Sequence, residues 1–245
     1  MNLLGLGLIG FAAVLLLALL LIKRKAPPSW RVLPALAKLS RAVDLSVEDG
    51  TRLFVALGRT SLLTPRGGAA LAGLALLRRI AEHASLSDRP PVAVAGESSL
   101  ALLAQDTLQA GYKSMGAGDL YQPTSGRLSG MTPFSSAAGA MPILQDENVS
   151  AGMLVGDFGV EAALLADAAE RQGAFLLGAS ADLSSQAALF ASAQEPLIGE
   201  ELFATSAYLD PGTSHSASLS VQDVLRWLIV LALLVGAVLK LIGLI

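Results

Sequence analysis

The sequence predicts an α/β domain with a Rossmann-like, mostly parallel sheet of about four or five strands, flanked by an N-terminal and a C-terminal transmembrane helix. Two observations lead to this prediction. Between residues 51 and 221, short apolar stretches alternate with longer segments of helical character. Such uninterrupted apolar strands are typical of a parallel sheet covered on both faces. Each end of the chain is an apolar run of roughly twenty residues, the length that crosses a bilayer.

The expected elements of the domain follow one another in regular alternation. The strands are predicted at residues 52–58, 92–96, 153–156 and 174–178, and the helices at residues 68–85, 98–112, 160–171, 183–193 and 199–208. A long connection, residues 116–150, is expected to be a lid or a subunit contact. Within it, Thr132 and Pro133 indicate a helix start, and Pro142 is expected to end that helix.

The two terminal runs set the division of the chain. Leu3 to Ile22 is unbroken and apolar, long for the core of a cleaved signal peptide, and basic residues follow it, so an anchor is favoured. Trp227 to Ile245 is the second span, in which Lys240 either snorkels to the interface or serves a function in the membrane. The predicted parts are a helix at 1–22, a basic linker at 23–50, the α/β domain at 51–221 and a helix at 222–245.

Charge is distributed unevenly along the chain. All 20 acidic residues lie between Asp44 and Asp223, against nine lysines and arginines, whereas the first 43 residues carry six basic residues and no acid. The acidic domain would repel nucleic acid, and the basic linker suits anionic lipid. Basic residues at 23–25 and at Arg226 predict a two-pass protein of the inner membrane with a cytoplasmic domain. In the linker, Leu33 to Val43 predicts an amphipathic helix that lies on the membrane or packs on the domain.

Several kinds of chemistry are excluded or disfavoured. The chain has no cysteine and only two histidines, His83 and His215, so thiolate and histidine-rich metal sites are excluded. Glycines at positions 5, 7 and 10 match a dinucleotide motif, but within a predicted span they favour helix packing instead. Asp157-Phe158-Gly159 has the letters of a kinase magnesium motif without its companions. No catalytic residue, metal ligand or cofactor is therefore predicted.

Polar residues follow a glycine at the end of each predicted strand. Because ligands of open α/β sheets bind beyond the carboxyl ends of the strands, these turns hold the candidate ligand-binding residues Thr60, Glu97, Ser98, Asp157 and Ser180. The carboxylates of Glu97 and Asp157 are suited to acid–base work or to Mg²⁺. The same residue types are also the preferred helix caps and first-turn residues, so a purely structural role is the alternative.

Three segments carry a resemblance to a known family. Residues 87–96, 192–204 and 222–227 are similar to a family of uncharacterised bacterial membrane proteins, over roughly Leu45 to the end of the chain. The resemblance implies no activity and no site residues.

The function expected from the sequence is that of a membrane-anchored, non-enzymatic scaffold or assembly protein. The expected partners are the lipid bilayer, other copies of the chain and other membrane proteins. The alternative is a membrane-tethered sensor that binds a small anionic ligand or nucleotide at the carboxyl edge of the sheet. An enzyme ranks third, because it would need Glu97, Asp157 and Ser180 to converge in one pocket.

Overall fold

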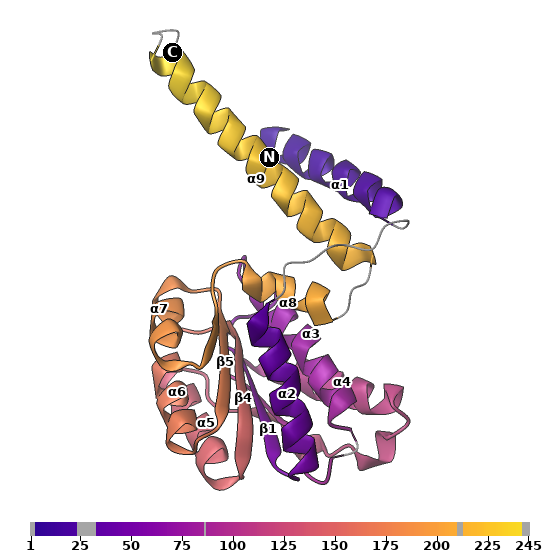
Figure 1. Ribbon diagram of the computed structural model, residues 1–245, viewed down its shortest axis with the longest axis vertical. Coiled ribbons are helices and arrows are strands. Elements are labelled where there is room, and N and C mark those ends of the chain that lie inside the picture. Colours follow the sequence, from indigo (N-terminus) through magenta and orange to yellow (C-terminus); the bar gives the residue numbers. More distant parts are fainter. Residues whose placement is uncertain (1–2, 24–32, 86, 210–212, 242–245) are drawn as a thin grey trace. The chain divides into compact units, whose positions relative to one another are not determined.

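The computed structural model describes residues 3–23, 33–85, 87–209 and 213–241 (Figure 1). The chain divides into two units, the α/β domain Val32–Leu209 and a second unit that contains the terminal helices. The predicted linker is described only from residue 33 onward, and its basic and proline residues at 24–32 lie outside the described part.

The domain is built on a six-stranded sheet in the order β3-β2-β1-β4-β5-β6, and every pairing is parallel. The strands are β1 (Arg52–Gly58), β2 (Val92–Ala95), β3 (Gly126–Leu128), β4 (Val149–Asp157), β5 (Phe175–Ser180) and β6 (Glu195–Leu197). This confirms the Rossmann-like α/β prediction, since the order is that of the dinucleotide-binding folds. The sheet has six strands, more than the four or five predicted. The edge strands β3 and β6 have only three residues each and no long apolar run, and Pro196 in β6 is unusual for a strand.

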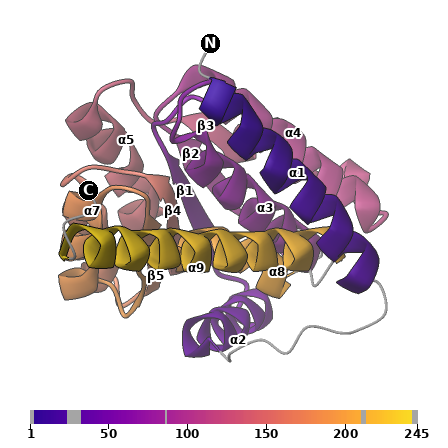
Figure 2. The ribbon, with the colours of Figure 1, turned by 90° about the horizontal axis from the view of Figure 1, so that it is seen from above.

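Helices cover both faces of the sheet (Figure 2). One layer holds α2 (Pro34–Glu48), α3 (Gly67–His83), α4 (Ser98–Ser114) and α8 (Glu201–Leu209), and the other holds α5 (Pro133–Asp146), α6 (Ala162–Arg171) and α7 (Leu183–Ser192). The side chains of β1 alternate between two cores: Val55 and Leu57 pack beneath α3, and Phe54 packs on the opposite face. This alternation is what a strand buried on both sides requires.

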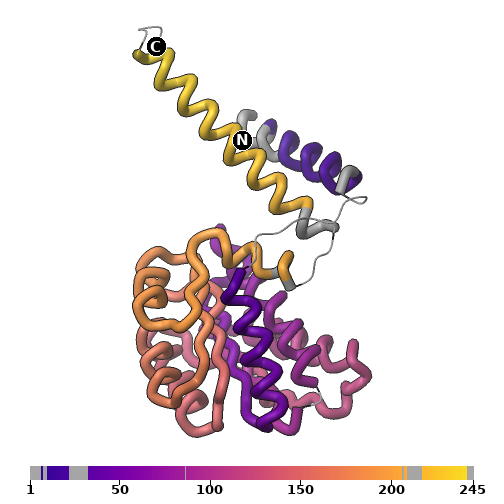
Figure 3. The backbone as a smooth tube through the Cα atoms, in the orientation of Figure 1, coloured from indigo at the N-terminus to yellow at the C-terminus, as the bar shows by residue number. Residues whose placement is uncertain are grey.

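The helix α2 packs on the domain, which decides between the two alternatives that the sequence left open. Leu36, Leu39 and Val43 are buried in the same core as β1 and α3. The backbone trace shows α2 in dark indigo running along the sheet (Figure 3). Its apolar stripe is therefore a core element of the domain.

The long connection contains regular structure. It holds two short 3₁₀ turns (Gly118–Leu120 and Pro123–Ser125), β3 and α5. Thr132 caps α5 through a capping box with Ser135, as the sequence predicts. The predicted end at Pro142 is wrong, because α5 continues to Asp146. Proline within a helix removes one amide hydrogen bond and clashes with the carbonyl four residues before it, which can kink a helix without ending it.

The terminal helices are α1 (Leu3–Lys23) and α9 (Thr213–Leu241). Among the described residues, only Ala217–Leu241 is long and apolar enough to cross a membrane, with a mean hydropathy of 2.3. In α1 the described apolar stretch is Gly10–Leu21, which is shorter, so the first span stays a prediction. The helix α9 begins well before Trp227 and includes His215.

Candidate functional site

The centre of the sheet is a topological switch point. The strands β1 and β4 are neighbours, but the chain moves from β1 toward β2 and from β4 toward β5, in opposite directions. Their carboxyl ends therefore lead into loops that diverge, residues 59–66 before α3 and residues 158–161 before α6. In open α/β sheets this crevice is the usual place of a ligand.

Three glycines let the backbone close tightly around this point. A Cβ on Gly58 would lie 2.4 Å from the Asp157 carbonyl oxygen, and one on Gly156 would lie 2.1 Å from the Leu57 carbonyl oxygen. A Cβ on Gly96 would lie 2.3 Å from Cγ of Arg59. Only Gly58 also needs a left-handed backbone, with φ of 77°. The loops after β1, β2 and β4 are thus in direct contact.

An open cavity of about 470 Å³ lies at the switch point, where it is lined by Arg59, Thr60, Ser61, Thr64, Pro65, Arg66, Glu97 and Asp157. Two arginines and two carboxylates face it, so opposite charges share one opening. Three of the five predicted site residues, Thr60, Glu97 and Asp157, are brought together here.

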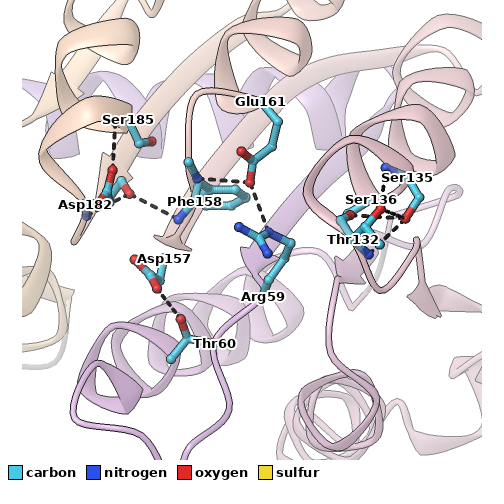
Figure 4. A network of polar contacts seen from close by, with 12 residues as sticks. Arg59, Thr60, Thr132, Ser135, Ser136, Asp157, Phe158, Glu161, Asp182 and Ser185 are labelled. Carbon is cyan, nitrogen blue, oxygen red and sulfur yellow. Dashed lines mark hydrogen bonds and ion pairs between the residues drawn. The ribbon is translucent and has the colours of Figure 1, made fainter.

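Ion pairs and hydrogen bonds connect the loops around the cavity, and Figure 4 shows the contacts Arg59–Glu161 and Thr60–Asp157. Arg59 Nε lies 3.0 Å from Oε1 of the buried Glu161, which also accepts the Gly159 amide at 3.0 Å. Arg66 Nη1 lies 3.5 Å from Oδ1 of Asp157 and 3.4 Å from Oδ1 of Asp182. The Thr60 hydroxyl donates to the Asp157 carboxylate. The loops after β1, β4 and β5 are held together by these contacts.

Glu97 and Ser98 stand at the start of α4 and have different surroundings. The Glu97 carboxylate is the N-cap, accepting the Leu100 amide at 2.8 Å. A hydrogen bond from Ser99, together with the amides of the first turn, lowers the pKa of Glu97 despite the opposing effect of burial. Ser98 is exposed and does not line the cavity. The capping alternative raised for Glu97 is therefore its observed role in this structure.

Ser180, the fifth predicted residue, lies beneath the surface at the end of β5. Its side chain is fully buried, and its Oγ accepts the amides of Phe158 and Asp182, each at 3.3 Å. This hydroxyl holds two loops in place and is separated from the cavity lining. Glu97, Asp157 and Ser180 thus do not converge on a single opening.

The helices α3 and α6, which follow the two strands of the switch point, begin without a side-chain cap, whereas Glu97, Thr132 and Asp182 cap α4, α5 and α7. The helix α3 begins at Gly67 after Arg66, with no acid in its first turn. Its Gly67 and Ala69 amides donate to the carbonyl oxygens of Thr64 and Arg66. What favours an anion at this helix start is therefore its partial positive charge together with the Arg66 guanidinium. In the part of the chain that the structure describes, no group of three histidine or acidic side chains is placed to hold a metal ion.

The comparisons with known proteins identify a family. A model for a domain of unknown function, DUF6754, matches residues 2–245. The chain belongs to the DUF6754 family. No curated protein and no solved structure matches it. The predicted resemblance to an uncharacterised family is confirmed, whereas the bacterial and membrane character of that family stays a prediction.

In this DUF6754 chain, sequence reasoning missed the basic half of the cavity. Arg59 and Arg66 line it, and Arg59 forms an ion pair with the buried Glu161. Arg59 directly follows Gly58, the last residue of a predicted strand, and this position indicates a residue at the carboxyl edge. The sequence Arg66-Gly67-Gly68 at a predicted helix start would have indicated Arg66, since a basic residue beside a helix N-terminus is suited to an anion. In the structure Gly67 is needed for the turn itself, because a Cβ there would lie 2.4 Å from the Leu62 carbonyl oxygen. Glu161 carries no comparable signal, because its burial depends on the packing of β4 against β1.

Proposed function

We propose that the chain is a membrane-anchored, non-catalytic binding module whose α/β domain takes a small, phosphate-bearing anion at the carboxyl edge of the sheet. One observation carries the proposal: the cavity at the switch point opens where α3 begins without a side-chain cap and beside Arg66. The parallel with dinucleotide-binding domains is one of fold alone.

The chemistry of the cavity supports an anion with attached hydroxyl groups. The Arg66 side chain is 59% exposed, and its two carboxylate contacts are long, so a phosphate can replace them at little cost. The carboxylates of Glu97 and Asp157 are acceptors for ligand hydroxyls. A volume of about 470 Å³ suits a small molecule such as a nucleotide or a lipid headgroup.

Thermal unfolding of the full chain in mild detergent tests this proposal. The probes are inorganic phosphate, nucleotides, and water-soluble short-chain phospholipids, which separate a free phosphate from a headgroup. A ligand at one hundred times its Kd stabilises the protein by about 2.7 kcal/mol. Arg66→Ala should abolish that gain, and the control Arg78→Ala, which removes a surface arginine paired with Glu82 on α3, should keep it. The proposal is contradicted if no probe stabilises the chain, or if Arg66→Ala responds like the parent.

The second candidate is a homo-oligomeric scaffold or assembly protein. It is supported by three glycines of the terminal helices, Gly7, Gly10 and Gly236, at which a Cβ would meet nothing within 4 Å. Such smooth faces allow close packing of membrane helices from other copies or other membrane proteins. Light scattering and native mass measurement in detergent test this candidate, and a strictly monomeric particle without co-purifying protein would contradict it.

The proposed location is the inner membrane, with two spans and a cytoplasmic domain. It is supported by the basic residues that follow the first apolar run and by Arg226 ahead of the second. Asp119→Cys, in an otherwise cysteine-free chain, provides the test. An impermeant maleimide should label it in inverted vesicles and not in intact cells. Labelling in intact cells would reverse the proposed orientation.

A further inference from the structure

Exposed apolar side chains lie in the loops and first helical turns at the carboxyl edge of the sheet. Leu63 is 96% exposed, Leu183 is 80% exposed and Met131 is 74% exposed. They belong to a set that we call the apolar rim, one or two members after each of β1, β3, β4, β5 and β6: Leu63, Met131, Phe134, Val160, Leu183 and Ile198. Because parallel strands end at the same edge, these side chains share one end of the domain.

The most exposed apolar side chains of the domain are those of the carboxyl edge. Among the described residues of the domain, the large apolar side chains exposed near the opposite, amino edge are Leu45, Met115, Leu120 and Phe190, which are 49%, 54%, 56% and 69% exposed. Both edges carry acids, but at the carboxyl edge Asp157, Glu161 and Asp182 form ion pairs with Arg59 and Arg66. Side chains as exposed as Leu63 and Leu183, gathered at one end of a domain, indicate a surface that is covered in the working protein.

The chain enters and leaves the domain at the edge that carries the apolar rim. The helix α2 has 15 residues and spans roughly 22 Å, and β1 with seven residues spans roughly 23 Å. A short turn at residues 49–51 joins them, so Pro34 lies level with the carboxyl end of β1. At the other end, α8 follows the carboxyl end of β6 directly, and Phe203 on it lies next to Gly68 at the start of α3.

The chain outside the domain is short on the C-terminal side. Only residues 210–212 separate Leu209 from α9, a reach of at most about 15 Å for the four Cα–Cα steps. The apolar segment Ala217–Leu241 begins within the next helical turn. The carboxyl edge therefore carries the domain's connections to the terminal helices, and β4, with nine residues, separates the two edges of the domain by roughly 30 Å.

We propose that the apolar rim docks on the lipid bilayer, so that the carboxyl edge of the domain lies in the headgroup region. The proposal rests on the membrane anchoring by α9 and does not require that the cavity bind a ligand. Side chains such as Leu63 and Leu183 would enter the boundary between headgroups and acyl chains, as the apolar face of an interfacial helix does. Arg66, at the same edge, would face the lipid phosphates, and the acids of the amino edge would point to water.

Single-cysteine labelling of the full chain tests the proposal, because the chain has no cysteine of its own. Environment-sensitive fluorophores are placed by Leu63→Cys, Phe134→Cys and Leu183→Cys at the rim, and by Leu45→Cys, Met115→Cys and Leu120→Cys as matched apolar controls at the amino edge. All six positions are exposed, so the fold should tolerate them, and unchanged thermal unfolding verifies this. The labelled proteins are reconstituted in phosphatidylcholine–phosphatidylglycerol vesicles with and without nitroxide-bearing lipids.

The expected result is a blue-shifted emission at the rim that loses most of its intensity to lipid-borne nitroxides, with controls that remain water-like and unquenched. Equal quenching at both edges, or none at either, overturns the proposal. A different outcome is that the rim fluorophores are shielded from water already in detergent and transfer energy between two copies of the chain. This would show that a second copy covers the rim, and it also overturns the proposal. Release of the chain from membranes by alkaline carbonate would remove the anchor on which the proposal rests and overturns it as well.

Discussion

The two edges of the sheet each carry a cluster of ion pairs, yet only one of them carries the features of a binding surface. At the amino edge, Glu147 forms ion pairs with Arg52 and Arg127. At the carboxyl edge, Arg59 pairs with Glu161, and Arg66 with two carboxylates. Ion pairs therefore do not distinguish the edges. The cavity, the uncapped start of α3 and the apolar rim do, and they occur together at the carboxyl edge.

The largest expected difference in the free energy of unfolding is between alanine variants of two glycines that have a left-handed backbone conformation. Gly58 at the carboxyl edge has φ of 77°, and Gly173 at the amino edge has φ of 65°. A Cβ on Gly58 would collide with the backbone of Asp157, whereas one on Gly173 would meet nothing within 4 Å. Gly58→Ala should lower the free energy of unfolding by about 3 kcal/mol or more, and Gly173→Ala by about 1 kcal/mol.

Chemical denaturation of both glycine variants measures this difference. Gly173→Ala is the matched control, because it adds the same methyl group to the same backbone conformation without the collision. Similar losses of unfolding free energy in the two variants would show that the loops at the switch point are packed less tightly than described above.

The second prediction concerns the stability that the ion pairs of Glu147 contribute at the amino edge. Burial alone would raise the pKa of Glu147, but the hydrogen bonds and charges of Arg127 and Arg52 outweigh it and hold the pKa below its ordinary value of 4.5. A lowered carboxyl pKa contributes stability above the unfolded value that is lost as the pH falls through the folded value. Glu147→Gln should cost about 2 kcal/mol at neutral pH and flatten the decline in stability below about pH 4.5.

Unfolding curves between neutral and acidic pH measure this effect in parent and variant. The response to phosphate-bearing probes should be unchanged in Glu147→Gln, because the residue lies at the other edge from the cavity. A lost response would mean that the two edges of the sheet are coupled.

A smaller effect is expected at the cap of α4. Glu97 accepts the Leu100 amide and the Ser99 hydroxyl, so Glu97→Ala should cost about 1 kcal/mol through the loss of a helix cap. Asp182→Ala at α7, another N-cap that accepts first-turn amides, is the matched variant and should cost a similar amount. Thermal unfolding measures both. A much larger cost at Glu97 alone would give it a structural role beyond capping.

The smallest effect on stability is expected at Arg66. Its side chain is 59% exposed and its two ion pairs are at the long end of the range, so Arg66→Ala should change the free energy of unfolding by less than about 1 kcal/mol. Denaturant titration without added ligand measures this. A loss of several kcal/mol would make Arg66 a structural residue, and its role in the proposed anion site would no longer follow.

The sequence was informative where local pattern decides the structure. The apolar stretch at 92–96 predicted β2, and the Thr132–Pro133 pair predicted the start of α5, since burial on both faces and capping are local signals. It failed at β3 and β6, whose pairing depends on neighbouring strands far away in the chain. In the same way it named Thr60 and Asp157 as candidates, but the opposing Arg66 came together with them only through the order of the strands.

Hydrogen–deuterium exchange of the full chain, compared between detergent and lipid nanodiscs, tests the central difference between the edges most directly. If the apolar rim docks on lipid, the loops at 59–66, 129–132, 158–161 and 181–182 should gain protection in nanodiscs. The amino-edge turns at 49–51, 115–122 and 147–148 should exchange equally in both media. Protection that is uniform, or that appears first at the amino edge, would show that the carboxyl edge does not dock on lipid.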